Sequence, residues 1–226
     1  MDYISSFIAS YGDLFAQGIV DTLVMTFGSC LFAYVIGLPL GVAFALTTPT
    51  GLHPMKVLNT VLGWIINIGR SIPFVILMVA IIPFTRLLVG TSLGVTGAIV
   101  PLTVAAAPFV ARIVEQSLAE VDGSLIEAAQ AFGATNVEIV TKVMLRESVP
   151  SLIRGVAITW VSLFGYVAMA GCIGAGGVGD IALRYGYQRW MADVMLVAVV
   201  ICVILVQLFQ SFCDWLAVKV DKRIRN

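Results

Sequence analysis

Few residues of this chain have the types and spacing of a reactive site. The single histidine, His53, has no clustered cysteines or carboxylates around it, so we expect no structural metal. Residues 174–179 satisfy the pattern Gly-x-Gly-x-x-Gly. A dinucleotide-binding fingerprint must follow a strand and open a helix, whereas this one follows a long apolar stretch. We therefore interpret it as a tight, closely packed turn.

The chain also lacks the residues that hydrolyse a nucleotide. It contains no Gly-Lys dipeptide, and hence no phosphate-binding loop of the Gly-x-x-x-x-Gly-Lys-Ser/Thr type. It shows neither the Ser/His/Asp nor the Cys/His set of a hydrolase. We expect no catalytic residue and no cofactor in this chain. Any energy from ATP would have to come from a separate protein.

The composition places much of the chain in a lipid bilayer. Of the 226 residues, 60% are hydrophobic and 12% are charged, whereas soluble domains carry about 25% charged residues. So few charged residues cannot cover a surface that faces water. Membrane lipid must therefore surround much of the protein surface. The apolar runs are long and continuous, which predicts an all-α integral membrane protein and not a barrel. The net charge of zero argues against nucleic acid as a partner.

Five apolar stretches have the length of a membrane-spanning helix. We expect them at residues 19–46, 57–83, 93–113, 153–173 and 194–216. In the first stretch, Gly37 and Gly41 have the spacing of a close-packing face for a neighbouring helix. We expect a single transmembrane domain over residues 1–226.

A lone arginine lies near the middle of the second stretch. A charge at that depth is costly, so Arg70 must face protein, water or a partner. Pro73, just after Ser71, is expected to interrupt the helix there. Two interpretations stay open: Arg70 lies at an interface between half-helices, or it faces a translocation path. For the path we name Arg70, Ser71, Pro73 and Met169; Met169 would be a flexible apolar plug, or else ordinary packing.

The most polar and charged segment runs from Ser124 to Pro150, and it predicts two short helices. Ser124 and Glu127 have the Ser-x-x-Glu pattern of a capping box, and Thr135 and Glu138 repeat this pattern. Between them, Gly133 can take the positive φ that ends a helix. We call residues 124–146 the knob. It is either a docking site for another protein or an amphipathic loop on the membrane surface.

Positive charge predicts the orientation of the knob, because cytoplasmic loops carry an excess of Lys and Arg. The loops on the side of the knob and the tail hold nine such residues: Lys56, Arg112, Lys142, Arg146, Arg154, Lys219, Lys222, Arg223 and Arg225. The other side holds three: Arg86, Arg184 and Arg189. We therefore expect the knob and the C-terminus in the cytoplasm and the N-terminus outside.

The first helix of the knob resembles the EAA motif of the permease subunits of bacterial ABC importers. Glu127, Ala128, Ala129 and Gly133 match its leading positions, and Val143 and Leu145 match its later apolar pair. The chain departs where the motif has a terminal proline, because Arg146 stands there; Pro150 would end the segment instead. The resemblance implies that the knob forms two coupling helices that dock on a cytoplasmic ATPase. The implied interface is Glu127, Ala128, Ala129, Phe132, Gly133, Ala134, Val143 and Leu145.

The likeness extends beyond the knob. Residues 67–74, 82–86, 100–103, 107–112 and 174–179 resemble the methionine-importer branch of these permeases, whose members also have five spans. The resemblance implies a homodimer in the bacterial inner membrane that imports D- or L-methionine or a related amino acid by alternating access. It also implies two cytoplasmic P-loop ATPase subunits, which bind ATP and Mg²⁺, and a lipoprotein-type binding protein outside.

Other function classes remain as alternatives. The main one is an ion-coupled amino-acid transporter or channel that works without an ATPase. Such a protein needs several ionisable groups inside the membrane, whereas only Arg70 lies deep in a span. A membrane scaffold that merely docks a partner would not require a broken, arginine-bearing span. An intramembrane enzyme is disfavoured by the missing nucleophile and base.

Overall fold

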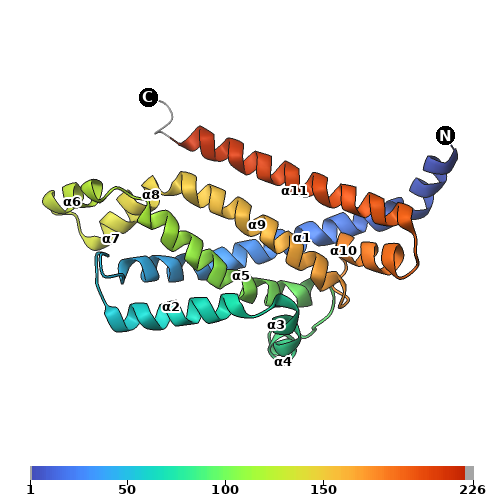
Figure 1. The fold of residues 1–226 in the computed structure, drawn as a ribbon, viewed down its shortest axis with the longest axis horizontal. Coiled ribbons are helices and arrows are strands. Elements are labelled where there is room, and N and C mark those ends of the chain that lie inside the picture. Colours follow the sequence, from blue (N-terminus) through green and yellow to red (C-terminus); the bar gives the residue numbers. More distant parts are fainter. Residues whose placement is uncertain (1, 222–226) are drawn as a thin grey trace. The chain divides into compact units, whose positions relative to one another are not determined.

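The computed structural model describes residues 2–221, and within these residues the chain forms helices and no strands (Figure 1). The predicted all-α membrane class is confirmed. Four helices of the described chain are long and apolar enough to cross a membrane. They are α1 (Asp2–Leu46, of which Ser5–Leu46 is the candidate span), α5 (Gly94–Ala119), α9 (Val149–Gly171) and α11 (Ala192–Val220).

The fifth candidate span is a broken helix, as Pro73 predicted. It consists of α2 (Lys56–Ser71) and α3 (Phe74–Ala80), which are bent by 100° at the break between them. Pro73 is the residue that precedes α3, where its missing N–H costs no helical hydrogen bond. The predicted number of five spans is reached when this pair counts as one.

Several helices extend beyond the predicted apolar stretches. α1 begins at Asp2 and not near residue 19. α4 (Ile82–Val89) includes Arg86, and α10 (Gly177–Ile181) with the π-helix η2 (Ala182–Tyr187) occupies a segment expected to be a connection. The apolar pattern marks only the residues that lipid or protein must cover. A helix can continue beyond them, because its backbone hydrogen bonds form equally well between polar residues.

The chain divides into two compact units, and each unit combines three separate segments. The first contains the residues up to Leu31 together with Ile72–Ala105 and Trp160–Phe209. The second contains Phe32–Ser71, Ala106–Thr159 and the residues from Gln210. The whole knob belongs to the second unit.

In the first unit, the glycine-rich segment packs closely, as its sequence predicted. Residues 172–176 connect α9 to α10, and the amide of Val178 donates a hydrogen bond to Thr22 Oγ1 on α1 at 2.9 Å. A Cβ at position 179 would lie 2.5 Å from the Cα of Ala168, so only glycine fits there. The pattern therefore serves close packing of α10 against α9.

In the second unit, α1 and α5 approach each other at two glycines. A Cβ on Gly37 would lie 2.7 Å from the carbonyl oxygen of Ala107, and one on Gly41 would lie 2.5 Å from that of Ala111. The predicted close-packing face of Gly37 and Gly41 is confirmed. This contact holds the C-terminal part of α1 against the helix that leads into the knob.

Candidate functional site

The knob begins with α6 (Gly123–Ala131), whose start differs from the prediction. Asp122 is the N-cap residue, and its Oδ1 accepts a hydrogen bond from the amide of Ser124 at 2.9 Å. The capping box predicted for Ser124 and Glu127 is therefore wrong. The helix begins one residue before Ser124, because the carboxylate of Asp122 satisfies one of the free amides of the first turn. Glu127 has no capping role and its side chain is exposed.

The elbow of the knob forms at Gly133, as predicted. Gly133 has φ +77°, a conformation that side chains with a Cβ rarely adopt. The amide of Ala134 donates to the carbonyl of Ala129 at 3.1 Å, and the amide of Gly133 donates to that of Gln130 at 2.9 Å. This pair of hydrogen bonds is the Schellman motif, which satisfies the last carbonyls of α6 and turns the chain.

The second helix of the knob opens with the predicted capping box. The amide of Thr135 donates to Glu138 Oε2 at 3.0 Å, and the amide of Glu138 donates to Thr135 Oγ1 at 3.4 Å. Lys142 Nζ lies 2.8 Å from Glu138 Oε1. The hydrogen bond from Lys142, followed by those from Thr135, lowers the pKa of Glu138 to about 2. The start of α7 (Asn136–Glu138) is thus held by a carboxylate that is ionised at any physiological pH.

Beyond α7 the chain forms a π-helix that the sequence did not reveal. This helix, η1 (Ile139–Met144), buries Ile139, Val140 and Met144, and it continues into α8 (Leu145–Glu147). Val143 and Leu145 are half-buried. Their burial fixes the second half of the knob within its unit.

The expectation that Pro150 ends the segment is wrong. Pro150 is the second residue of α9, in the first turn of the helix, where a proline sacrifices no helical hydrogen bond. Ser148 Oγ donates to the carbonyl of Ser117 at 2.9 Å, and Ser151 Oγ donates to Ser117 Oγ at 3.1 Å. These bonds join the start of α9 to α5, at the base of the knob.

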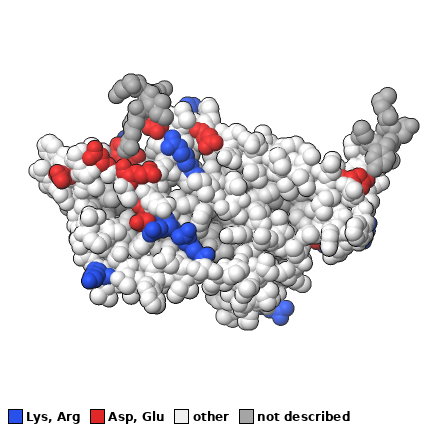
Figure 2. All heavy atoms as spheres, viewed as in Figure 1, with Lys and Arg blue, Asp and Glu red and all other residues white. Residues whose placement is uncertain are grey.

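The first half of the knob presents an open surface. α6 has no buried residue, Phe132 is 92% exposed and Val137 is 72% exposed. Glu127 and Ala128 are exposed, and Ala129 and Ala134 are half-buried. Figure 2 shows scattered acidic atoms on a mostly uncharged surface over the part of the chain that holds α6. Large apolar side chains exposed on such a surface are typical of a protein docking site.

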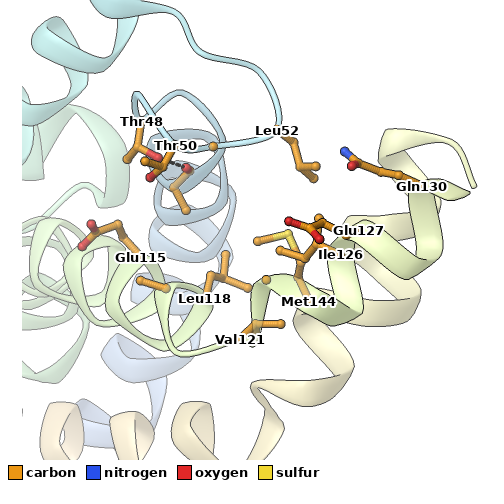
Figure 3. A pocket seen from close by; sticks show the side chains of 14 residues that line it. Thr48, Thr50, Leu52, Glu115, Leu118, Val121, Ile126, Glu127, Gln130 and Met144 are labelled. Atoms are coloured by element: carbon orange, nitrogen blue, oxygen red, sulfur yellow. Dashed lines mark hydrogen bonds between the residues drawn. The ribbon is translucent and has the colours of Figure 1, made fainter.

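A cavity of about 450 Å³ lies between α6, α5 and the loop after α1 (Figure 3). Glu127 and Gln130 line it from α6, Thr50 lines it from the loop after α1, and Glu115 lines it from α5. Glu115 Oε2 also lies 3.3 Å from Arg112 Nη1. α6 contacts η1, and the cavity lies between α6 and the residues of α5 and of the loop after α1.

The residues predicted for a translocation path lie on two different units. Arg70 is in the last turn of α2, where Ser71 Oγ donates to the carbonyl of Asn67 at 2.7 Å. The side chains of Arg70, Ser71 and Pro73 are exposed. Among the described residues, no ion pair or hydrogen bond joins Arg70 to another side chain. Met169 belongs to the first unit and is 47% exposed, so it is not buried packing within this chain.

Sequence reasoning missed three residues of this region. Asp122, two residues before Ser124, is of a residue type that favours N-cap positions, and Glu115 has i,i+3 spacing from Arg112. His53 was considered only as a metal ligand, whereas its Nε2 lies 2.6 Å from Asn136 Nδ2 at the start of α7. Asp122 and Glu115 left a local signal in the sequence, but the contact of His53 left none.

Comparison with known proteins connects this architecture to transport. Residues 37–226 match the family described as binding-protein-dependent transport system inner membrane component. Over 220 residues the chain is 47% identical to the probable D-methionine transport system permease protein MetI of Vibrio cholerae, which covers 97% of this chain and 98% of that protein. It is 51% identical over 158 residues to the D-methionine transport system permease protein MetI of Escherichia coli (strain K12), which covers 70% and 73% of the two chains.

The fold agrees with these sequence matches. A chain in a structure described as inward facing conformations of the MetNI methionine ABC transporter matches with a TM-score of 0.93 and 48% identity, covering 94% of this chain and 99% of that one. An amino acid ABC transporter matches in fold alone, with a TM-score of 0.78 at 17% identity. Because the family model covers most of its length and full-length relatives share almost half of its residues, the chain belongs to the family of binding-protein-dependent transport system inner membrane components.

Proposed function

We propose that this chain is the permease subunit of an ATP-driven importer for methionine or a closely related amino acid. The observation that carries the proposal is the whole-length likeness to a chain of a methionine ABC transporter, at 48% identity and a TM-score of 0.93. Two copies of the chain would form the translocation path, in the bacterial inner membrane and surrounded by lipid. A binding protein outside would deliver the amino acid.

The knob would couple the permease to two cytoplasmic ATPase subunits, which bind ATP and Mg²⁺. Exposed Phe132 would insert into the ATPase, with Glu127, Ala128, Ala129, Gly133 and Ala134 around it. Small side chains beside one large aromatic group allow a partner to approach closely, and such an aromatic group often dominates the binding energy. Val143 and Leu145 are half-buried, so they would support this surface more than contact the partner.

The broken helix would contribute to the path. Supporting this proposal, Arg70 ends a half-helix, is exposed, and has no ion-pair partner among the described residues. Ser71 and Pro73 lie at the same break, and Met169 offers an exposed, flexible apolar side chain. A second copy of the chain is the natural source of partners for these groups.

The orientation follows from charge: the knob and the C-terminus lie in the cytoplasm and the N-terminus lies outside. Of the basic residues that support it, Lys222, Arg223 and Arg225 lie outside the described residues. Lys142, Arg146 and Arg154, in and beside the knob, are all exposed and agree with a cytoplasmic, water-facing surface.

The test is purification in mild detergent from native membranes, followed by identification of co-purifying proteins. We expect a P-loop ATPase in equal amount.

The Phe132→Ala variant should weaken ATPase binding by roughly tenfold or more, because the loss of an aromatic anchor costs on the order of 2 kcal/mol. Leu87→Ala on α4 is the matched control, because it removes a similarly exposed side chain (86%) that is not part of the knob. A chain that purifies alone and transports without ATP would instead favour the ion-coupled transporter or channel, with Arg70 as its intramembrane charge.

A further inference from the structure

The loop between α1 and α2, residues 47–55, is fixed by its own backbone. The amide of Gly51 donates to the carbonyl of Thr48 at 2.9 Å, the amide of His53 donates to that of Leu46 at 3.0 Å, and the amide of Met55 donates to that of Thr47 at 3.2 Å. A Cβ on Gly51 would lie 2.8 Å from the carbonyl oxygen of Ala45, so the turn has no room for a larger residue. The loop therefore holds His53 in one place relative to the end of α1.

The loop is also bound to α2. Asn59 Nδ2 donates to the carbonyl of Phe44 at 3.1 Å and to Thr47 Oγ1 at 3.2 Å. Thr47 Oγ1 in turn donates to the carbonyl of Ala43 at 2.9 Å. The end of α1, the loop and the start of α2 thus form one hydrogen-bonded block within the second unit.

His53 extends from this block to the knob. Its Nε2 lies 2.6 Å from Nδ2 of Asn136, which is 83 residues away in the sequence. An amide N–H donates only to an unprotonated ring nitrogen, so Asn136 is the donor and Nε2 is the acceptor. Asn136 is the first residue of α7 and directly follows Thr135, the residue of the capping box. The bond therefore acts on the start of α7, beside the capping box.

The bond lies between an open part and a packed part of the knob. The cavity of about 450 Å³ lies between Leu52, the neighbour of His53, and Glu127 and Gln130 on α6 (Figure 3). No residue of α6 is buried. The buried Ile139 and Val140 anchor the chain just after α7, and the bond of His53 to Asn136 adds a second, polar attachment at the first residue of that helix.

We propose that the loop of residues 47–55 is a brace that sets the orientation of the knob, and that His53 is the positioning residue through which it acts on coupling. The brace transmits movements of α1 and α2 to α7 by way of His53 and Asn136, in addition to the covalent connections of the knob to α5 and α9. This inference rests on the proposed docking of an ATPase on the knob.

The experiment measures the number of substrate molecules transported per ATP hydrolysed, in proteoliposomes that contain the permease, its ATPase and its binding protein. We expect His53→Ala and Asn136→Ala each to lower this ratio at least threefold without loss of ATPase co-purification. The double variant should be no worse than either single variant, because both remove the same bond. His53→Gln, which offers a side-chain oxygen as acceptor, should restore most of the ratio.

Thr60→Ala is the matched control. Thr60 is exposed near the start of α2, and within the described part of the chain its hydroxyl donates only to the carbonyl of Lys56 in the same helix, at 2.8 Å. The number of substrate molecules transported per ATP hydrolysed should therefore stay at the wild-type value in this variant. An unchanged ratio in His53→Ala, or an additive loss in the double variant, would overturn the brace.

Failure of the proposed function gives a different result, since the wild-type complex itself would not transport or would not assemble. In that case hydrogen–deuterium exchange of the permease alone still decides the question. The amides of residues 135–138 should exchange at least threefold faster in His53→Ala than in the wild type or in Thr60→Ala. Equal exchange would show that His53 does not hold the knob.

Discussion

At the scale of single residues, the backbone conformation of Gly133 determines the angle between the two helices of the knob. A Cβ at this position would meet no atom within 4 Å, so a larger residue would cause no steric overlap. It would instead strain the backbone, because φ is positive here. The left-handed conformation costs residues with a Cβ roughly 1–2 kcal/mol, and more for β-branched ones, whereas Asn tolerates it.

We therefore predict that Gly133→Val uncouples ATP hydrolysis from transport, while Gly133→Asn retains coupling. The ratio of transported substrate to hydrolysed ATP in the reconstituted complex measures this. Equal ratios in the two variants would mean that the φ of this residue does not determine the geometry of the elbow.

Glu138 leads to a prediction about pH. Its folded pKa of about 2 lies below the unfolded value of about 4.3, so its contribution to stability is present above the unfolded pKa. This contribution is lost as the pH falls from about 4.3 through about 2. After correction for intrinsic rates, the amide of Thr135, which donates to the Glu138 carboxylate, should keep its hydrogen-exchange protection from pH 7 down to about pH 5. Glu138→Ala should lose this protection at every pH, whereas loss in the wild type already at pH 5–6 would contradict the capping box.

At the scale of elements, the contact of α1 with α5 depends on Gly41. A methyl group there would lie 2.5 Å from the carbonyl oxygen of Ala111, which is backbone and cannot rotate away. Gly41→Ala should therefore destabilise the protein by about 1–3 kcal/mol, as overpacking does. Gly12→Ala is the control, because its methyl group would meet only Ile8 Cγ2 at an ordinary 3.5 Å. Thermal unfolding in detergent should show a lower Tm for Gly41→Ala alone.

At the scale of the whole molecule, the distribution of basic residues predicts which surfaces face the cytoplasm. In a variant without the four native cysteines, Tyr187→Cys should react with a membrane-impermeant maleimide in intact spheroplasts. Val137→Cys in the knob should react only after permeabilisation. Both wild-type side chains are well exposed, at 64% and 72%, so accessibility within the chain does not bias the comparison. The reverse labelling pattern would invert the proposed orientation and remove the knob from the cytoplasm.

The sequence alone determined the features that depend on composition or on residues close together in the chain. The scarcity of charge required helices in a membrane. Pro73 ended a helix, Gly133 provided the elbow, and Thr135 with Glu138 capped the next helix, because each acts through backbone groups within a few residues. The EAA pattern around Glu127 pointed to the correct family for the same reason.

Tertiary structure decided what depends on residues far apart in the chain. Ile139, Val140 and Met144 lie in a π-helix, whose register was not evident from their apolar pattern. The cavity behind α6 and the contact of His53 with Asn136 exist because α1, α5 and the knob meet in one unit. A hydrogen bond between residues 83 positions apart leaves no periodicity in the sequence, so only the folded arrangement of the helices could reveal it.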